Sequence, residues 1–294
     1  MVMKRWMSNL LIVVFALVFL ISGYYLVSYY VNAWRQQEAY NNLAAIVEQV
    51  RNDQVQPKPT TPPDETQSTE TQGSETLPEE TTPQVTEPVM VQVKDPDTGE
   101  MIEVLEEYAQ LYQTNSDFAG WISIDGTIIN YPVMHKPESL NYYLYRDFYK
   151  KYSNGGSLYV REDCDVNKPS DNVTIYGHNM KISGTMFHQL LDYTDEKFWQ
   201  EHQYIRFDTL SERHTYQIMA VFKTSANVDE GFAYHLFINA DSETEFDTFV
   251  STCKELAFYE TGVTASYGDK LITLSTCEYT LDNGRLVVVA KRIS

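Results

Sequence analysis

The sequence is short of cysteine and of positive charge, and each shortage excludes a class of protein. Three cysteines in 294 residues are too few for a small disulfide-stapled scaffold. Lysine and arginine number 22 against 41 acidic residues, a net charge of −19, so we expect no nucleic-acid partner, which would require clustered basic residues. No repeat of fixed period is present. A hydrophobic content of 43% nevertheless excludes a wholly disordered chain.

The negative charge is unevenly distributed along the chain. Residues 1–50 carry a net charge of +1, residues 51–100 carry −8 and residues 101–294 carry −12. The middle segment is therefore the most acidic per residue, and we predict that it does not fold. The last 194 residues are numerous enough to bury a single large core.

The N-terminal region contains one long uncharged run, residues 6–34, whose centre at 10–27 is almost continuously apolar. A helix needs about 20 such residues to cross the hydrocarbon core of a bilayer. Lys4 and Arg5 precede the run and favour a cytoplasmic N-terminus. A cleaved signal peptide is the alternative, but its apolar region would span only about 7–15 residues. We therefore predict an uncleaved anchor, with residues 1–32 forming the cytoplasmic tip and transmembrane segment.

Three further regions follow the anchor. Residues 33–55 have a helical composition and are predicted to form a juxtamembrane helix. Residues 56–100 are rich in proline, threonine and glutamate, which indicates a disordered stalk that lifts the next domain away from the bilayer. Residues 101–294 form the predicted globular domain, which opens with a helix at 101–112.

Short strand-like segments dominate the globular domain. They are rich in β-branched and aromatic residues and are mostly bounded by glycine, proline, asparagine or aspartate. Helical segments lie between them, and the longest of these, at 242–258, places apolar residues on one face. This pattern predicts a mainly β fold, an antiparallel closed or half-closed barrel decorated with helices. The predicted strands are 120–124, 127–131, 157–160, 172–176, 204–207, 214–223, 270–275 and 285–290.

Of the three cysteines, Cys277 is the candidate nucleophile. It follows an apolar strand that becomes polar at its end, so a rigid scaffold holds the thiol close to solvent. Cys253 lies on the apolar face of the predicted helix 242–258 and is expected to be a small buried residue. Cys164 lies in an acidic segment that we expect to be an exposed loop. A bridge between Cys164 and Cys253 remains open.

A nucleophilic cysteine needs a proton carrier and a group that stabilises negative charge. Among six histidines, His178 is the best candidate, because it lies just beyond the strand 172–176, after Gly177, which permits a sharp turn. Arg285 opens the last apolar strand, eight residues after Cys277. A hairpin with the loop 278–284 would bring its guanidinium beside the end of the Cys277 strand.

Three segments together resemble the sortases, the membrane-anchored transpeptidases of Gram-positive bacteria. The sequence TLSTC at 273–277 is similar to the signature around their catalytic cysteine. The tripeptide at 176–178 resembles their histidine segment, and 285–290 resembles the strand that carries their arginine. The resemblance covers residues 101–294 and implies an eight-stranded β-barrel. Class B fits best, because the predicted helices 101–112 and 242–258 match features of that class.

The resemblance also implies a mechanism. Cys277 would attack the threonine carbonyl of a C-terminal sorting motif and form a thioacyl intermediate, with His178 as general acid and base. Arg285 would hydrogen-bond either the oxyanion or the substrate backbone. An amine would then resolve the intermediate, so neither a metal nor a cofactor is expected. Four further residues are placed beside the site by the same resemblance: Tyr176, Ser275, Thr276 and Glu278.

The implied partners are secreted proteins that carry the sorting motif, and an amine acceptor that is either a peptidoglycan crossbridge or a pilin lysine. The lipid bilayer is a third partner, through the N-terminal helix, in a single-pass protein of the cell membrane with an extracellular catalytic domain. Two alternatives stay open. One is an extracellular cysteine peptidase, and the other is a non-catalytic, membrane-tethered β-barrel that only binds a ligand.

Overall fold

The computed structural model describes residues 2–55 and 87–294, so most of the predicted stalk lies outside the described residues. Within these described residues, the α-helices are α1 (Val2–Val55), α2 (Glu106–Thr114), α3 (Glu196–Glu201) and α4 (Glu243–Leu256). The strands are β1 (Met90–Lys94), β2 (Met101–Leu105), β3 (Phe118–Ser123), β4 (Asn130–Met134), β5 (Leu158–Val160), β6 (Asn172–Tyr176), β7 (Asn179–Met180), β8 (Thr185–Met186), β9 (Tyr204–Thr209), β10 (Thr215–Ser225), β11 (Leu271–Cys277) and β12 (Gly284–Arg292). The described part of the chain also contains the 3-10 helices η1 (Tyr142–Tyr145), η2 (Phe187–Thr194) and η3 (Tyr234–Leu236).

Eight strands close into a barrel in the order β10-β12-β11-β6-β5-β4-β3-β9. Most neighbours are antiparallel, but β11 pairs with β6 and β4 pairs with β5 in parallel. The central strands carry long apolar runs, and residues 286–290 of β12 are fully buried because they pack both inside and outside the barrel. Closure leaves the barrel without an open edge. The predicted eight-stranded, helix-decorated barrel is confirmed.

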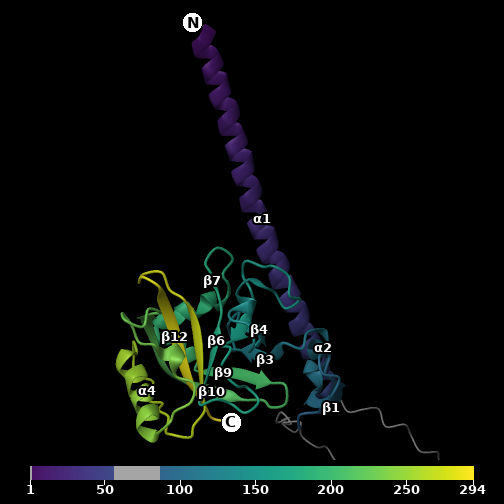
Figure 1. The fold of residues 1–294 in the computed structure, drawn as a ribbon, viewed down its shortest axis with the longest axis vertical. Coiled ribbons are helices and arrows are strands. Elements are labelled where there is room, and N and C mark those ends of the chain that lie inside the picture. Colours follow the sequence, from purple (N-terminus) through teal and green to yellow (C-terminus); the bar gives the residue numbers. More distant parts are fainter. Residues whose placement is uncertain (1, 56–86) are drawn as a thin grey trace, which may run out of the picture.

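Helix α4 covers one side of the barrel, at the outer edge of the domain in Figure 1. Ser242 caps its start by accepting a hydrogen bond from the N–H of Glu245. Its apolar face, which includes Phe246 and Cys253, packs on β10 and β12 in a second core cluster. The predicted helix at 242–258 and the predicted burial of Cys253 are both confirmed.

The start of the domain differs from the prediction. Residues 101–105 form β2, and the helix α2 begins only at Glu106. Strand β2 pairs with β1, which lies inside the predicted stalk range 56–100, so the folded domain begins by Met90 rather than at Met101. The pairing buries Val93 and Val104, and it decides the structure of a short apolar run that the sequence pattern leaves ambiguous.

Helix α1 is one continuous helix that joins the predicted anchor to the predicted juxtamembrane helix (Figure 1). The first half of α1 is apolar and exposed. Among the described residues, α1 is the one helix with the length and hydropathy to cross a membrane. Its second half packs on the domain through Tyr40, Leu43 and Val47, all nearly inaccessible to solvent. The spacing of three and four residues places these side chains on one face of the helix.

Polar contacts strengthen this docking at both ends of the buried face. The Tyr40 hydroxyl donates a hydrogen bond to the Gly156 carbonyl at 2.8 Å, and Gln36 donates to the same oxygen at 2.6 Å. Further along, Arg51 forms ion pairs with Glu107 at 3.1 Å and Asp208 at 2.6 Å.

The contacts correct the predicted role of the stalk. Residues 36–51 of α1, which follow the apolar run, pack directly on the domain, so no part of the predicted stalk separates the apolar run from the domain surface. The interpretation of the stalk as a spacer is therefore wrong. Its predicted disorder lies outside the described residues.

We expect Tyr40→Ala to lower the free energy of unfolding of the domain by about 2–4 kcal/mol, because it removes a fully buried ring and its hydrogen bond. Denaturant unfolding of the full chain in detergent, followed by tryptophan fluorescence, measures the change. The matched control is Tyr30→Ala, whose ring is 50% exposed on the same helix and should cost at most about 0.5 kcal/mol. Equal effects of the two substitutions would contradict the docking.

Candidate functional site

The candidate site forms where three strands end. Strand β11 runs parallel to β6 with Ser275 opposite Tyr176, so Cys277 and His178, each two residues further on, lie at matching positions. On its other side β11 is antiparallel to β12, and Cys277 is the direct partner of Arg285. Adjacent strands lie about 4.8 Å apart. All three predicted residues therefore meet, and they line one cavity of about 370 Å³.

Cys277 is the last residue of β11 and is only partly exposed. The six residues before it in the strand are buried, which holds its backbone in one position. Its carbonyl accepts a hydrogen bond from the Asn179 side chain at 2.9 Å. The thiol thus combines a rigid backbone with access to the cavity, as a nucleophile requires.

The other two cysteines are buried and do not line this cavity. The prediction of an exposed loop for Cys164 is wrong: its side chain is almost fully covered, with Sγ 3.5 Å from the Asn172 carbonyl. Burial raises the pKa of the Cys164 thiol to about 11, and burial likewise raises the pKa of Cys253. Both thiols are free, so the possible bridge between them is not formed.

His178 is held in one orientation by the backbone. Its Nε2 lies 2.8 Å from the Leu144 carbonyl, and because a carbonyl can only accept, Nε2 carries the hydrogen of this bond. Nδ1 is then the nitrogen that can take up a proton. Burial lowers the pKa of His178 below its ordinary value of 6.5, and the bond to Leu144 offsets this only in part. The imidazole is therefore mainly neutral at pH 7.

Gly177 brings His178 close to the barrel. A side chain at this position would place Cβ 2.4 Å from Leu158 and 2.5 Å from Phe187, so close packing requires glycine, rather than the predicted sharp turn. The Gly177 N–H donates to the Ser275 carbonyl, and the Thr276 hydroxyl donates to the Gly177 carbonyl at 2.8 Å. These bonds continue the contact between β6 and β11 up to the catalytic candidates.

The Arg285 guanidinium turns back on its own loop. Nη1 donates to the carbonyls of Asn283 at 3.1 Å and Gly284 at 2.9 Å. Within residues 2–55 and 87–294, its other nitrogens donate no hydrogen bond and are available to a bound ligand. The predicted hairpin between Cys277 and Arg285 is confirmed by their direct pairing.

The four supporting candidates divide into two groups. Tyr176, Ser275 and Thr276 line the cavity, and the Ser275 hydroxyl lies 2.6 Å from that of Tyr234. Glu278 does not line it. Its buried carboxylate pairs with Lys223 at 3.2 Å and accepts the N–H and hydroxyl of Thr280, which holds the loop 278–284 in shape.

Several residues of the site escaped the sequence analysis. Asn179 connects Cys277 to a second histidine, His188, whose Nδ1 lies 2.6 Å from the Asn179 side-chain oxygen. Its position directly after His178 was the one available signal. The remaining lining residues come from separate loops and strands and carry no local motif: Leu140, Asn141, Leu144, Tyr159, Arg161, Glu162, Ala226, Tyr234 and His235.

The arrangement suits covalent acyl transfer. A thiol is placed between an imidazole and a guanidinium, in a cavity large enough for several residues of an extended peptide. In the part of the chain that the structure describes, no group of three or more histidine, cysteine or acidic side chains could hold a metal ion.

Known proteins share this architecture. A family model described as the sortase domain matches residues 122–293. The chain is 30% identical to a sortase B of Listeria monocytogenes over 195 residues, which is 65% of this chain and 76% of that protein. A Staphylococcus aureus sortase B–substrate complex superposes with a TM-score of 0.59 at 29% identity, covering 65% of this chain and 86% of the other. A sortase B of Bacillus anthracis superposes with a TM-score of 0.59 at 32% identity, covering 70% and 89%.

Proposed function

Because this chain belongs to the sortase family and is a class B cysteine transpeptidase, we propose that it cleaves a C-terminal sorting motif of secreted proteins and joins the new C-terminus to an amine. One observation carries the proposal: Cys277 lies between His178 and Arg285 at the ends of three paired strands, in one cavity. A protein that only binds a ligand would not need these three groups together.

In the first half of the reaction, Cys277 Sγ attacks the carbonyl carbon of the scissile peptide bond. The thiol proton passes to Nδ1 of His178, and negative charge develops on the carbonyl oxygen. Arg285 has guanidinium N–H groups available to bind this oxyanion. The C–N bond then breaks, His178 returns the proton to the leaving amine, and the acyl group remains on Cys277 as a thioester.

In the second half, an amine replaces the departed fragment. His178 takes a proton from the incoming amine as its nitrogen attacks the thioester. The C–S bond then breaks, and His178 passes the proton to Sγ, so that Cys277 leaves as the thiol. The thioester retains the energy of the cleaved peptide bond, so the transfer needs no other energy source. Water in place of the amine would give a cysteine peptidase, which remains the second candidate function.

For the acceptor we propose an amine of the cell surface, on a peptidoglycan crossbridge or on a pilin lysine. The domain at 101–294 carries a net charge of −12, which favours the approach of a cation. One carboxylate, that of Glu162, also lines the catalytic cavity and could attract an ammonium group. Both features support a positively charged acceptor without selecting between the two kinds.

We also propose that α1 crosses the membrane once, with its N-terminus in the cytoplasm and the domain outside. The apolar half of α1 has the length for a single crossing, and Lys4 and Arg5 precede it. Anchoring would hold enzyme, sorting-motif protein and acceptor in one layer and raise their effective concentrations.

The direct test is mass spectrometry of the products formed from a panel of sorting-motif peptides with candidate amines. The proposal expects an adduct of the motif's N-terminal fragment with one amine. Hydrolysed fragment alone, at every amine concentration, would favour the peptidase. No cleavage of any peptide would support the ligand-binding alternative.

The lowered pKa of His178 leads to a prediction about how kcat/KM depends on pH. Uptake of the thiol proton requires neutral imidazole, so kcat/KM should rise with pH as His178 loses its proton, with a midpoint below 6.5. A pH profile of peptide cleavage measures this midpoint. His202→Gln is the control, since His202 contacts the Asp125 carbonyl away from the cavity and should leave the midpoint unchanged. A midpoint above 6.5 would contradict the assignment.

A further inference from the structure

The folded domain contacts α1 directly after the apolar part of the helix. The apolar run ends at Val27, and Tyr29, two residues later, already packs against the core of the domain. At about 1.5 Å of rise per residue, no more than one helical turn separates the two. Helix α1 continues without a break to Val55. On the single membrane crossing proposed above, the domain surface that surrounds α1 near Tyr29 therefore lies next to the bilayer.

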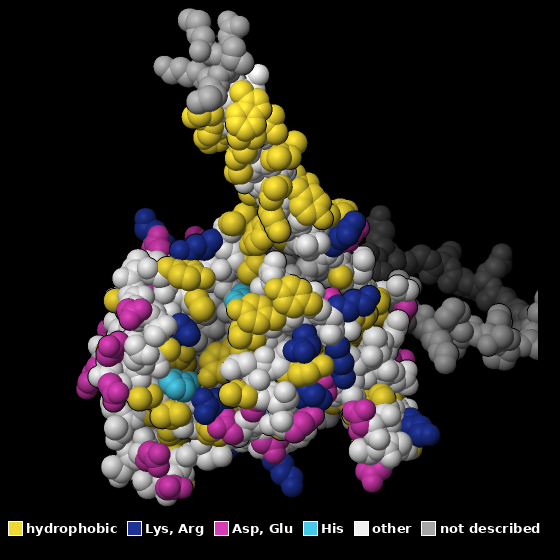
Figure 2. Space-filling view, turned by 45° about the horizontal axis from the view of Figure 1, so that its top comes forward, with side chains coloured by type: hydrophobic (Ala, Val, Ile, Leu, Met, Phe, Trp, Pro, Cys, Tyr) yellow, Lys and Arg dark blue, Asp and Glu magenta, His cyan; other side chains and the backbone are white. Residues whose placement is uncertain are grey.

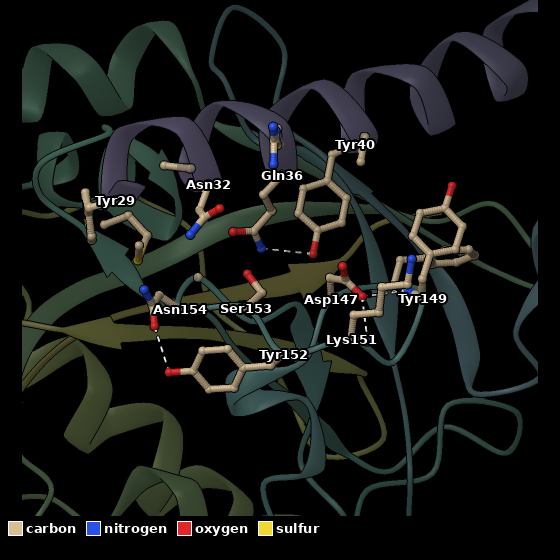
Figure 3. A pocket seen from close by; sticks show the side chains of 16 residues that line it. Tyr29, Asn32, Gln36, Tyr40, Asp147, Tyr149, Lys151, Tyr152, Ser153 and Asn154 are labelled. Atoms are coloured by element: carbon tan, nitrogen blue, oxygen red, sulfur yellow. Dashed lines mark hydrogen bonds between the residues drawn. The ribbon is translucent and has the colours of Figure 1, made fainter. Parts of the chain in front are cut away.

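A cavity of about 480 Å³ marks this point, between α1 and the loop 147–155. Figure 3 shows side chains of α1 on one side of the cavity and side chains of the loop on the other. Arg35, Lys151 and Tyr152 line it, together with Met180 of β7. The loop, β7 and the foot of α1 therefore form one continuous surface.

We call this surface the helix-foot face and define it by Arg35, Lys151, Tyr152, Lys181, Ile182 and Tyr279. Its apolar members are well exposed: Tyr152 at 77%, Ile182 at 56% and Tyr279 at 57%. Lys181 joins its two halves, because it follows Met180 and its Nζ lies 3.6 Å from the centroid of the Tyr279 ring. In Figure 2, hydrophobic side chains gather at the foot of the helix with basic ones around them, and most acidic ones lie towards the rim.

The charge of the helix-foot face opposes that of the chain. The chain carries −19, yet the charged members of this face are Arg35, Lys151 and Lys181. Among the described residues, none of the three is in an ion pair. The carboxylate of Asp147 lines the cavity, but it accepts backbone N–H groups of its own loop. Exposed tyrosines beside unpaired basic side chains match the chemistry of a phospholipid headgroup layer.

We propose that the helix-foot face rests on the outer headgroup layer of the bilayer that α1 crosses, with its basic side chains on lipid phosphates and its apolar ones in the interface. The inference rests on the anchoring proposed above, but not on the chemistry at Cys277. It places the catalytic cavity at the membrane: the Tyr145 ring lies 6.4 Å from that of Tyr152 and 5.5 Å from that of His178. The enzyme would then reach peptide bonds close to the bilayer surface.

The test measures the depth of one residue of the face in full-length protein reconstituted in nanodiscs that contain anionic phospholipid. Tyr152→Cys in a Cys277→Ala background carries a bimane label, and lipids with a nitroxide on the headgroup quench it. Cys164 and Cys253 are buried and stay unlabelled. The matched control is Ser211→Cys, exposed near the C-terminus at the end of the domain away from the anchor (Figure 1).

We expect quenching at position 152 to exceed that at position 211 several-fold. Equal quenching at the two positions, whether weak or strong, would overturn the proposal. The charge-reversed pair Lys151→Glu and Lys181→Glu should reduce quenching at 152 by about two-fold or more, and unchanged quenching would overturn the role of the phosphates. Protein that fails to enter nanodiscs would refute the anchoring itself. Because the background is Cys277→Ala, none of these outcomes depends on catalysis.

Discussion

Cys277→Ala is expected to lower kcat/KM for cleavage of a sorting-motif peptide by about four orders of magnitude or more, because it removes the atom that forms the thioester. The substitution should leave the domain folded, since Cys277 ends its strand and is partly exposed. Peptide cleavage and the transfer of the acyl group to an added amine both measure the loss. The thioacyl intermediate should also disappear from mass spectra of the intact protein.

Cys164→Ala is the matched control for this prediction. Cys164 is buried, its thiol is free, and it does not line the catalytic cavity. Its replacement should affect stability by about 1–2 kcal/mol and leave kcat/KM within a few-fold of the wild-type value. Substantial activity of Cys277→Ala, or an equal loss in Cys164→Ala, would remove Cys277 as the nucleophile.

The meeting of Cys277, His178 and Arg285 could be predicted from the sequence because all three lie at strand ends. Cys277 and Arg285 belong to consecutive strands joined by a short loop, so their pairing follows from a hairpin. The position of His178 was harder to predict, since β6 and β11 are parallel neighbours almost 100 residues apart along the chain. Its assignment rested on the turn after an apolar strand and on the family resemblance. The register pairs Tyr176 with Ser275, so His178 and Cys277 each lie two residues beyond a paired position.

The docking of α1 could not be predicted in the same way. Tyr40 and Gly156 are 116 residues apart, and no periodicity within 33–55 indicates which surface its apolar face covers. Arg51 likewise finds Asp208 across 157 residues. The prediction of a spacer was wrong for this reason. Composition identified a helix at 33–55 and an acidic segment after it, but only tertiary contacts show that the helix packs on the domain.

Burial of short segments was the other source of error. Cys164 follows three charged residues, which suggested exposure, yet the barrel wall covers its side chain. Residues 101–105 fit either a helix or a strand, and only their pairing with β1 decides between them. In both cases the deciding contacts come from neighbouring segments that carry no clear pattern of their own.

Arg285→Met is expected to lower kcat/KM by about two to three orders of magnitude, the usual effect of removing one oxyanion donor. Methionine keeps most of the length of the side chain and loses the guanidinium N–H groups. The loss should fall on kcat more than on KM, because the oxyanion exists only after Cys277 has attacked. Arg285→Lys should recover only part of the activity, since one ammonium cannot keep the bonds to Asn283 and Gly284 and also bind substrate as the planar guanidinium does.

Arg292→Met provides the matched control, because β12 begins with Gly284 and Arg285 and ends with Arg292. Both side chains are partly exposed on one strand, but only Arg285 lies beside Cys277 and lines the catalytic cavity. Steady-state kinetics of the two methionine variants therefore separates the effect of losing a guanidinium beside Cys277 from the effect of losing one at the other end of the strand. Equal kcat values for the two variants would show that Arg285 acts through the stability of the strand. A loss confined to KM would instead assign it to the binding of the substrate backbone.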